Sequence, residues 1–488
     1  MQDLLPVLRV LAMLLVFFAL CMGVPLAASW YAGDGLWEVW AQGMGVSVAV
    51  GLMLWQLMRQ HRQELQPRHG VILVTLVWVC LPLSAALPLV LAYQAMGQTL
   101  PFTHAYFEAV SGLTTAGASV LSNLDALPVS INIWRTFLQW VGGMGILVLA
   151  VAIMPLLGVG GSQLFRAEAA GPVKDTKLTP RITGTAKGLW GVYALFSISC
   201  FGGYWLGGMP PIDALMHMFT TVSLGGLSSH DASFGYFQSP LLEAIATVFM
   251  VAASCNFALY FVAMRKGHLH GFWSDPEMRA TVGVLLVSSV AVSVLLWVKG
   301  AYSPADALRY GVFNTVSVAT TTGFATTNYL LWPVFAPVLM LILSGFTSSA
   351  GSTGGGIKMM RMLILCSQAR RELTRLVHPR AVQPVVLGRR VVDSRMIFAV
   401  LAFMLVYGGT IVLLSMVLML TDLDPLTAFS AVVASVHCLG PGLGEVGPAA
   451  TYAVLSDFQI WVCTLGMLLG RLEILSFIAL LTPAFWRR

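Results

Sequence analysis

Long apolar segments alternate with short polar ones along most of the chain. A helix needs about 20 apolar residues to cross a hydrocarbon core about 30 Å thick. By this measure the sequence predicts about ten spans, which lie near 5–27, 38–57, 70–94, 134–157, 185–207, 241–263, 280–299, 334–365, 396–420 and 457–484. The first apolar stretch exceeds the core of a typical signal peptide, so we expect it to be a retained span.

Between the later spans lie four segments that are too short to cross the membrane, at 104–113, 212–222, 305–319 and 425–436. Each leads into a turn that ends in glycine. The turns are Thr114-Thr115-Ala116-Gly117, Ser223-Leu224-Gly225-Gly226, Thr320-Thr321-Thr322-Gly323 and His437-Cys438-Leu439-Gly440. Their recurrence predicts four repeats, each made of a span, a short helix that enters the membrane and stops, an extended loop and a second span.

These repeats divide the chain into five regions. We expect two N-terminal transmembrane helices in 1–69, followed by pore repeats in 70–165, 166–265, 266–366 and 367–488. The expected fold is an all-α membrane protein with pseudo-fourfold symmetry. Irregular backbone at membrane depth is tolerated only inside protein or beside a water-filled cavity, so we expect the four turns to share one central cavity.

The residues of the turns suit a dehydrated cation. In potassium filters backbone carbonyls replace the water around the ion, and glycine lets consecutive carbonyls face one side because it tolerates positive φ. Threonine hydroxyls can add oxygen ligands, and the C-terminal ends of the short helices carry partial negative charge. One such turn is weak evidence, but four at similar spacing predict that all the turn residues line a single cation pore.

Composition and charge support a membrane location and orient the chain. Hydrophobic residues make up 57% of the sequence and charged residues 10%, whereas soluble domains carry about 25% charged residues. Of the 27 Lys and Arg residues, all but four fall on one side of the predicted topology, the exceptions being Arg135, Lys299, Arg309 and Arg471. Because cytoplasmic loops carry the basic excess, we expect both termini in the cytoplasm. Acidic residues gather outside, either as a mouth that concentrates cations or as a passive result of this sorting.

The eighth predicted span is interrupted. Its apolar sequence stops at Leu343 and resumes at Ile357, with mostly small and hydroxyl residues between them. Glycine costs about 1 kcal/mol in a helix, so the stretch favours an intramembrane loop over helix packing through small residues. Arg471 falls midway along the last predicted span, where a charge usually faces a pore or a partner. We expect a barrier below the filter, formed by Gly345, Gly351, Ser352, Thr353, Gly354, Gly355, Gly356, Lys358 and Arg471.

Several motifs resemble those of TrkH-type membrane subunits in the Trk/Ktr/HKT potassium-uptake superfamily. They include SGLTTAGAS (111–119), QLFRAEAAGPVKDTKLTPRI (163–182), TTTGFATTNY (320–329), GSTGGGIK (351–358) and GPGLGEVGP (440–448). The resemblance implies K⁺ as the transported ion, a homodimer in the bacterial inner membrane and a TrkA-like cytoplasmic ring that carries the nucleotide sites. The chain shows no Walker or GxGxxG motif in a strand–turn–helix context, so we expect no organic cofactor on it.

The fourth turn departs from these relatives, which usually carry Asn-Asn where this chain has His437-Cys438. His437 is either a packing residue or a group near the pore that titrates between about pH 5 and 8. A sodium-permeable relative and a cation-coupled secondary transporter of the same fold are the alternatives. Glycine in all four turns favours potassium, since a serine there favours sodium in plant-type relatives. Repeats that run in one direction disfavour the inverted repeats of many coupled transporters, and no nucleophile–base cluster in the sequence indicates an enzyme.

Overall fold

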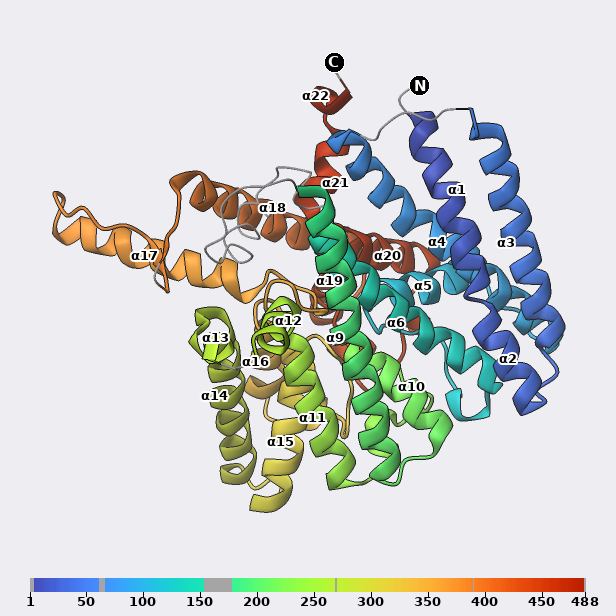
Figure 1. The fold of residues 1–488 in the computed structure, drawn as a ribbon. Helices are drawn as coiled ribbons and strands as arrows, with labels where there is room; N and C mark the ends of the chain where they lie inside the picture. Colours follow the sequence, from blue (N-terminus) through green and yellow to red (C-terminus); the bar gives the residue numbers. More distant parts are fainter. Residues whose placement is uncertain (1–3, 61–65, 153–177, 268–269, 389, 487–488) are drawn as a thin grey trace.

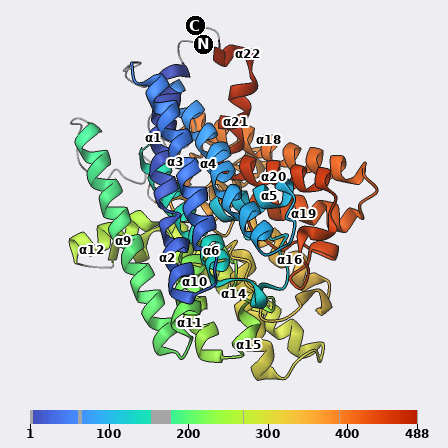
Figure 2. The ribbon, with the colours of Figure 1, turned by 90° about the vertical axis from the view of Figure 1, so that its right-hand side faces the viewer.

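The computed structural model is a bundle in which long helices surround short central ones (Figures 1 and 2). It describes residues 4–60, 66–152, 178–267, 270–388 and 390–486. The predicted all-α fold is confirmed, because the only strands in these ranges are β1 (Val386–Leu387) and β2 (Arg390–Val391), which form a small antiparallel hairpin. Most of the motif at 163–182, and the predicted boundary between 165 and 166, lie outside the described residues.

Three helices precede the repeats. α1 (Leu5–Leu20) and α2 (Gly23–Ala32) together form the first candidate span, and α3 (Trp37–Met58) returns beside α1. The two helices approach closely at Gly51, where a Cβ would press on the side chain of Val16. A small residue at that point therefore sets the spacing of α1 and α3.

Four units then follow the same order of long helix, short helix and second helix. Their helices are α4 (Pro67–Ala95), α5 (Phe102–Leu113) and α6 (Val129–Ala152); α9 (Leu178–Leu206), α10 (Pro211–Val222), α11 (Pro240–Ser254) and α12 (Phe257–Lys266); α14 (Pro276–Val298), α15 (Pro304–Ala319), α16 (Phe335–Ser344) and α17 (Met359–Val377); α18 (Ser394–Met419), α19 (Pro425–His437), α20 (Asp457–Arg471) and α21 (Ile474–Leu481). Short helices α13 (His270–Ser274) and α22 (Pro483–Trp486) lie at the ends of units, and single 3₁₀ turns lie in the outer loops.

Local sequence explains where the short central helices begin. α10, α15 and α19 each start on a proline, whose fixed φ suits the first helical turn. The side chains of Ser303 and Asp424 also cap α15 and α19 by accepting a bond from a backbone N–H three residues on. These three helices, and α5, lie within two residues of the bounds that the sequence predicts.

The second helices of the units differ from expectation, because more of them break. The described helices include six candidate spans, or eight if each of two bent pairs counts as one span. α11 and α12 meet at 91°, and α20 and α21 meet at 108°, whereas the sequence predicted a break only within 334–365. Arg471 is therefore the last residue of α20 rather than a mid-span residue. The helix ends there because Glu473 adopts a left-handed φ of 52°.

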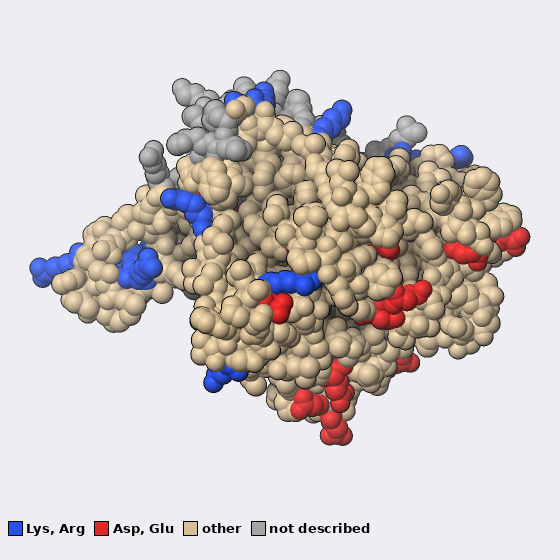
Figure 3. All heavy atoms as spheres, turned by 90° about the horizontal axis from the view of Figure 1, so that it is seen from below, with Lys and Arg blue, Asp and Glu red and all other residues tan. Residues whose placement is uncertain are grey.

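Charge is distributed unevenly over the surface. Figure 3 views the lower face of Figure 1 and shows most of its acidic side chains to the right, with basic side chains on the α17 arm that projects to the left. Two acidic residues are buried in ion pairs and do not contribute to this exposed charge. Glu108 lies 2.6 Å from Arg135, and Glu243 lies 2.7 Å from Arg309. These two carboxylates brace helices and add little to the charge of an open mouth.

Candidate ion pore

The four predicted turns meet at the centre of the bundle and form a ring. Each final glycine faces a carbonyl oxygen of the next turn, because a Cβ built on that glycine would meet the oxygen: Gly117 faces Gly225, Gly226 faces Thr322, Gly323 faces Leu439, and Gly440 faces Ala116. The facing residue always stands directly before the next final glycine. The contacts therefore run through the turns in chain order and close on the first.

All four turns share one alternating backbone conformation. The final glycines have φ of 78°, 74°, 88° and 96°, and the residues two positions earlier, Thr115, Leu224, Thr321 and Cys438, have φ of 54°, 54°, 64° and 54°. Alternation of left-handed and right-handed residues brings successive carbonyls toward one side, as a filter requires. A left-handed non-glycine residue costs about 1–3 kcal/mol, so the same strain at four equivalent positions indicates a functional constraint.

Hydroxyl groups stand at the inner end of three turns. Thr114, Ser223 and Thr320 each donate a hydrogen bond to the carbonyl four residues earlier on their own short helix, at 2.7, 2.8 and 2.8 Å. Because the proton points back to the helix, each oxygen keeps lone pairs that can accept, one of which the Thr322 hydroxyl already uses at Thr320. That these three hydroxyls are oxygen ligands of a cation stays a prediction.

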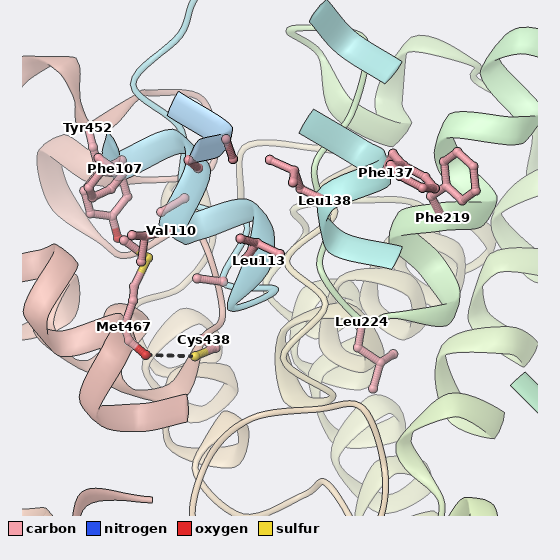
Figure 4. Packing of buried hydrophobic residues seen from close by; sticks show 14 of the residues in the cluster. Phe107, Val110, Leu113, Phe137, Leu138, Phe219, Leu224, Cys438, Tyr452 and Met467 are labelled. Atoms are coloured by element: carbon pink, nitrogen blue, oxygen red, sulfur yellow. Dashed lines mark hydrogen bonds between the residues drawn. The ribbon is translucent and has the colours of Figure 1, made fainter. Parts of the chain in front are cut away.

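The fourth turn offers no such hydroxyl. The Nδ1 atom of His437 lies 2.8 Å from Ser344 Oγ, and its ring stacks against Tyr407 of α18 with centroids 5.9 Å apart. These contacts favour the packing interpretation of His437 over that of a titratable pore group. The Cys438 thiol points to the carbonyl of Met467 on α20, as Figure 4 shows, and the residue is 1% exposed. An outside thiol reagent therefore has little access to it.

A pocket opens outward from the ring. Of the predicted turn residues, the four final glycines line it, and the wall above them includes residues of all four units, such as Ser119, Ser228, Ala325 and Val446. This pocket forms a vestibule on one side of the ring. The other turn residues are buried behind or below it.

Side chains outside the turns hold two of the carbonyls, and the sequence analysis did not single them out. Gln139 of α6 donates to the Gly225 carbonyl at 2.7 Å and accepts from the Leu227 N–H at 3.2 Å. Tyr452 donates its hydroxyl to the Gly440 carbonyl at 2.9 Å. Gln139 could have been found, since a polar residue inside an apolar span is rare. Tyr452 lies in a loop whose sequence gives no such signal.

A titratable cluster lies at the vestibule wall. The imidazole of His230 contacts the carboxylates of Asp125 and Asp213 and stacks on Tyr236 with ring centroids 3.6 Å apart. Burial lowers the pKa of His230, but the hydrogen bonds to Asp213 and Asp125 outweigh it and raise that pKa above its usual value. Asp231 also lines the pocket. The charge of this cluster therefore changes with pH at the outer mouth.

The predicted barrier loop lies directly below the ring. Thr353 donates its hydroxyl to the carbonyl of Val222 at 3.1 Å, and the Gly355 N–H donates to Thr321 Oγ1 at 2.9 Å. A Cβ on Gly355 would overlap the carbonyl oxygen of His437. The loop thus contacts the third and fourth turns and the last residue of α10, which precedes the second turn.

Arg471 joins the loop to the remaining turn. Its Nη2 donates to Thr115 Oγ1 at 2.7 Å and to the Thr353 carbonyl at 3.2 Å. Lys358 donates to the Gly354 carbonyl at the other side of the loop. Lys358 and Arg471 therefore both contact the loop that lies beneath the ring.

Bonds at both ends fix the loop. The Glu277 carboxylate accepts the N–H groups of Ala350 at 2.7 Å and Met360 at 3.0 Å. Ser349 N–H donates to Ser254 O, and Phe257 N–H donates to Gly351 O, so the loop fills the break between α11 and α12. The other predicted members make contacts within and beside the loop. Ser352 donates its hydroxyl to the Ser349 carbonyl. Gly345 packs against the His437 ring, and Gly356 packs against the Gly345 carbonyl oxygen.

Comparisons with known proteins agree with this geometry. The family model described as the cation transport protein TrkH matches residues 38–487. The chain is 44% identical over 484 residues to the Trk system potassium uptake protein TrkH of Vibrio parahaemolyticus, covering 99% of both, and 42% identical over 480 residues to that of Escherichia coli strain K12, covering 98% of both. The crystal structure of the potassium transporter TrkH from V. parahaemolyticus matches with a TM-score of 0.91 and 42% identity over 99% of each chain.

Proposed function

This chain belongs to the TrkH family of cation transport proteins, and from that premise we propose that it takes up K⁺ across a bacterial inner membrane through the ring of four turns. The observation that carries the proposal is the closed ring, in which each final glycine faces a carbonyl of the next turn. Oxygen ligands suit a hard cation, and carbonyl rings are the known means of replacing the water around K⁺. The family transports ions, so we assign no enzymatic role.

Growth of a potassium-uptake-deficient bacterium on low potassium tests this proposal. We expect the wild-type chain to restore growth when a suitable regulatory partner is present, and Gly323→Ser to lose most of that growth, because a Cβ on Gly323 would overlap the Leu439 carbonyl. Gly408→Ala is the matched control, since nothing lies within 4 Å of a Cβ at that site on α18. Failure of the wild type despite normal amounts in the membrane would contradict the proposal.

We also propose that the loop 345–358 and Arg471 form the gate of this pore. The loop and Arg471 together contact the first, third and fourth turns and the end of α10 before the second turn, which supports a barrier on the ion path. An ion leaving the ring toward the inside meets this segment first. Opening then requires the loop to move away from the turns.

The partners follow from the family resemblance. We propose a homodimer and a TrkA-like nucleotide-binding ring on the cytoplasmic face, since the relatives are named as parts of a Trk system. The start of α1 and the last described helix, α22, lie at the same end of the molecule (Figure 1), which supports a location of both on one side of the membrane. Reporter fusions at each terminus test the orientation, and reconstitution with and without the regulatory ring tests its effect on flux.

A further inference from the structure

A recurring hydrogen bond holds the chain just after each final glycine. In each unit a buried polar side chain stands on the short helix nine or ten residues before that glycine, and it bonds the extended segment two or three residues after it. These side chains are Glu108, His217, Asn314 and Ser430. Each is 1% exposed or less, and none of them lines the outer pocket. We call these four side-chain connections the filter clamps.

The first two clamps are charged or aromatic, and they are linked. The Glu108 carboxylate accepts from Ser119 Oγ at 3.1 Å and from the Val120 N–H at 3.2 Å. His217 uses Nδ1–H to reach the Asp213 carbonyl, so its Nε2 accepts from Ser228 Oγ at 3.0 Å.

Arg135 connects these two clamps. It bonds Glu108 at 2.6 Å and Ser119 Oγ at 3.0 Å, and it reaches the Ser228 carbonyl at 3.4 Å. The first and second filter loops are therefore held by one buried network.

The other two clamps use neutral groups. Asn314 donates to Thr326 Oγ1 at 2.7 Å and accepts from the Thr326 N–H at 3.1 Å. Ser430 accepts from the Leu443 N–H at 2.8 Å and donates to the Leu443 carbonyl at 3.1 Å. Four different side chains thus make the same connection at equivalent places.

We propose that Glu108, His217, Asn314 and Ser430 are positioning residues that hold the four filter loops at a fixed radius and so set the preference for K⁺ over Na⁺. This inference rests on the proposed K⁺ function. The segment after each glycine has no regular secondary structure, so a bond to the short helix limits how far the carbonyls can move inward. A ring that cannot contract coordinates the larger K⁺ better than the smaller Na⁺.

The third clamp offers the sharpest test, because Thr326 can be changed at constant shape. Thr326→Val removes the hydroxyl that Asn314 binds, and Thr326→Ser retains it. Thr315→Val is the matched control. Thr315 is fully buried on α15, the short helix that also carries Asn314, and its hydroxyl oxygen has no hydrogen-bond partner among the described residues. Purified variants are reconstituted in liposomes, and K⁺ and Na⁺ fluxes are measured separately on the same protein amount.

We expect Thr326→Val to lower the K⁺/Na⁺ flux ratio by roughly threefold to tenfold, the range for loss of one neutral hydrogen bond. Thr326→Ser and Thr315→Val should keep the wild-type ratio. A purely structural role would reduce the amount of folded protein and leave the ratio unchanged. If Thr326→Val does not fold, the K⁺/Na⁺ flux ratio of Ser430→Ala, which removes the fourth clamp independently, tests the inference in its place.

The outcomes separate the two proposals. If the wild type carries K⁺ and both Thr326→Val and Ser430→Ala keep its flux ratio, the clamps do not set selectivity and this inference is wrong. If the control Thr315→Val changes the ratio as much as Thr326→Val, the effect is not specific to the clamp and the inference is wrong as well. A wild type without K⁺ flux would contradict the proposed function itself.

Discussion

At the scale of single residues, the buried polar groups are those whose partners the sequence analysis could not assign. Arg135 stood out only as an exception to the charge pattern, yet it is fully buried and pairs with the equally buried Glu108. Burying two charges costs free energy unless geometry and further hydrogen bonds are good. Here Asn132 and Ser119 complete the guanidinium's contacts.

Arg135→Leu should destabilise the protein by about 3–5 kcal/mol, because it leaves the Glu108 carboxylate buried without its cation. Thermal unfolding of the detergent-purified protein measures this. The double variant Arg135→Leu, Glu108→Gln should recover part of the loss, since no unpaired charge remains. A single variant as stable as the wild type would show that the pair is not needed.

We also expect K⁺ entry to depend on pH through a single residue, His230. Since the pKa of His230 is raised by its two carboxylate partners, the imidazole is charged at acid pH and neutral above that pKa. Raising the pH therefore makes the outer mouth one unit more negative and should favour cation entry. A unit charge about 10 Å away in water contributes about 0.4 kcal/mol, which is about a twofold change in the apparent KM for K⁺.

Two variants identify the group that is responsible. In His230→Gln the apparent KM for K⁺ should no longer depend on pH. It should stay at the lower value that the wild type reaches at high pH. The sequence analysis raised His437 as the alternative, and its packing against Ser344 and Tyr407 leads us to expect an unchanged profile for His437→Asn. A pH profile that is flattened in His437→Asn and unchanged in His230→Gln would assign acid inhibition to the fourth turn.

At the scale of elements, the short central helices and the broken second helices have different origins. The short helices were predictable, because prolines mark their starts and their length is too small for a span. The breaks at Cys255-Asn256 and after Arg471 were not, since neither holds the run of glycines that marks the barrier loop. The first of these breaks is filled by backbone bonds from the loop of another unit.

The end of α20 also places Arg471 beneath the ring. Arg471→Ala should raise basal K⁺ flux, because it removes the bonds to Thr115 and Thr353 and a positive charge close to the ion path. At about 8 Å and an effective dielectric constant of about 20, that charge opposes a cation by about 2 kcal/mol, or about thirtyfold in rate. Arg471→Lys keeps the charge and should stay near the wild-type flux. Unchanged or lower flux in a well-folded Arg471→Ala protein would contradict the gate.

At the scale of the whole molecule, four units of differing sequence build one ring. The equivalence lies in the backbone, since all four turns share left-handed residues at the same two positions. The side chains are not equivalent, because the fourth turn lacks the inner hydroxyl and each filter clamp has its own chemistry. Pseudo-fourfold symmetry therefore fixes the shape of the pore while leaving its electrostatics uneven.

The sequence by itself determined that this chain crosses a membrane, that four short helices end in glycine turns, and that one span is interrupted. Hydropathy and backbone preference act between neighbours along the chain, so they can be read there. Only the tertiary structure decided the order of the ring, the position of the loop beneath it and the groups that brace it. Arg471 and Thr115 stand 356 residues apart and meet through a single hydrogen bond. Which distant polar groups become partners is decided by packing, because burial leaves each of them only the partners that the fold brings within reach.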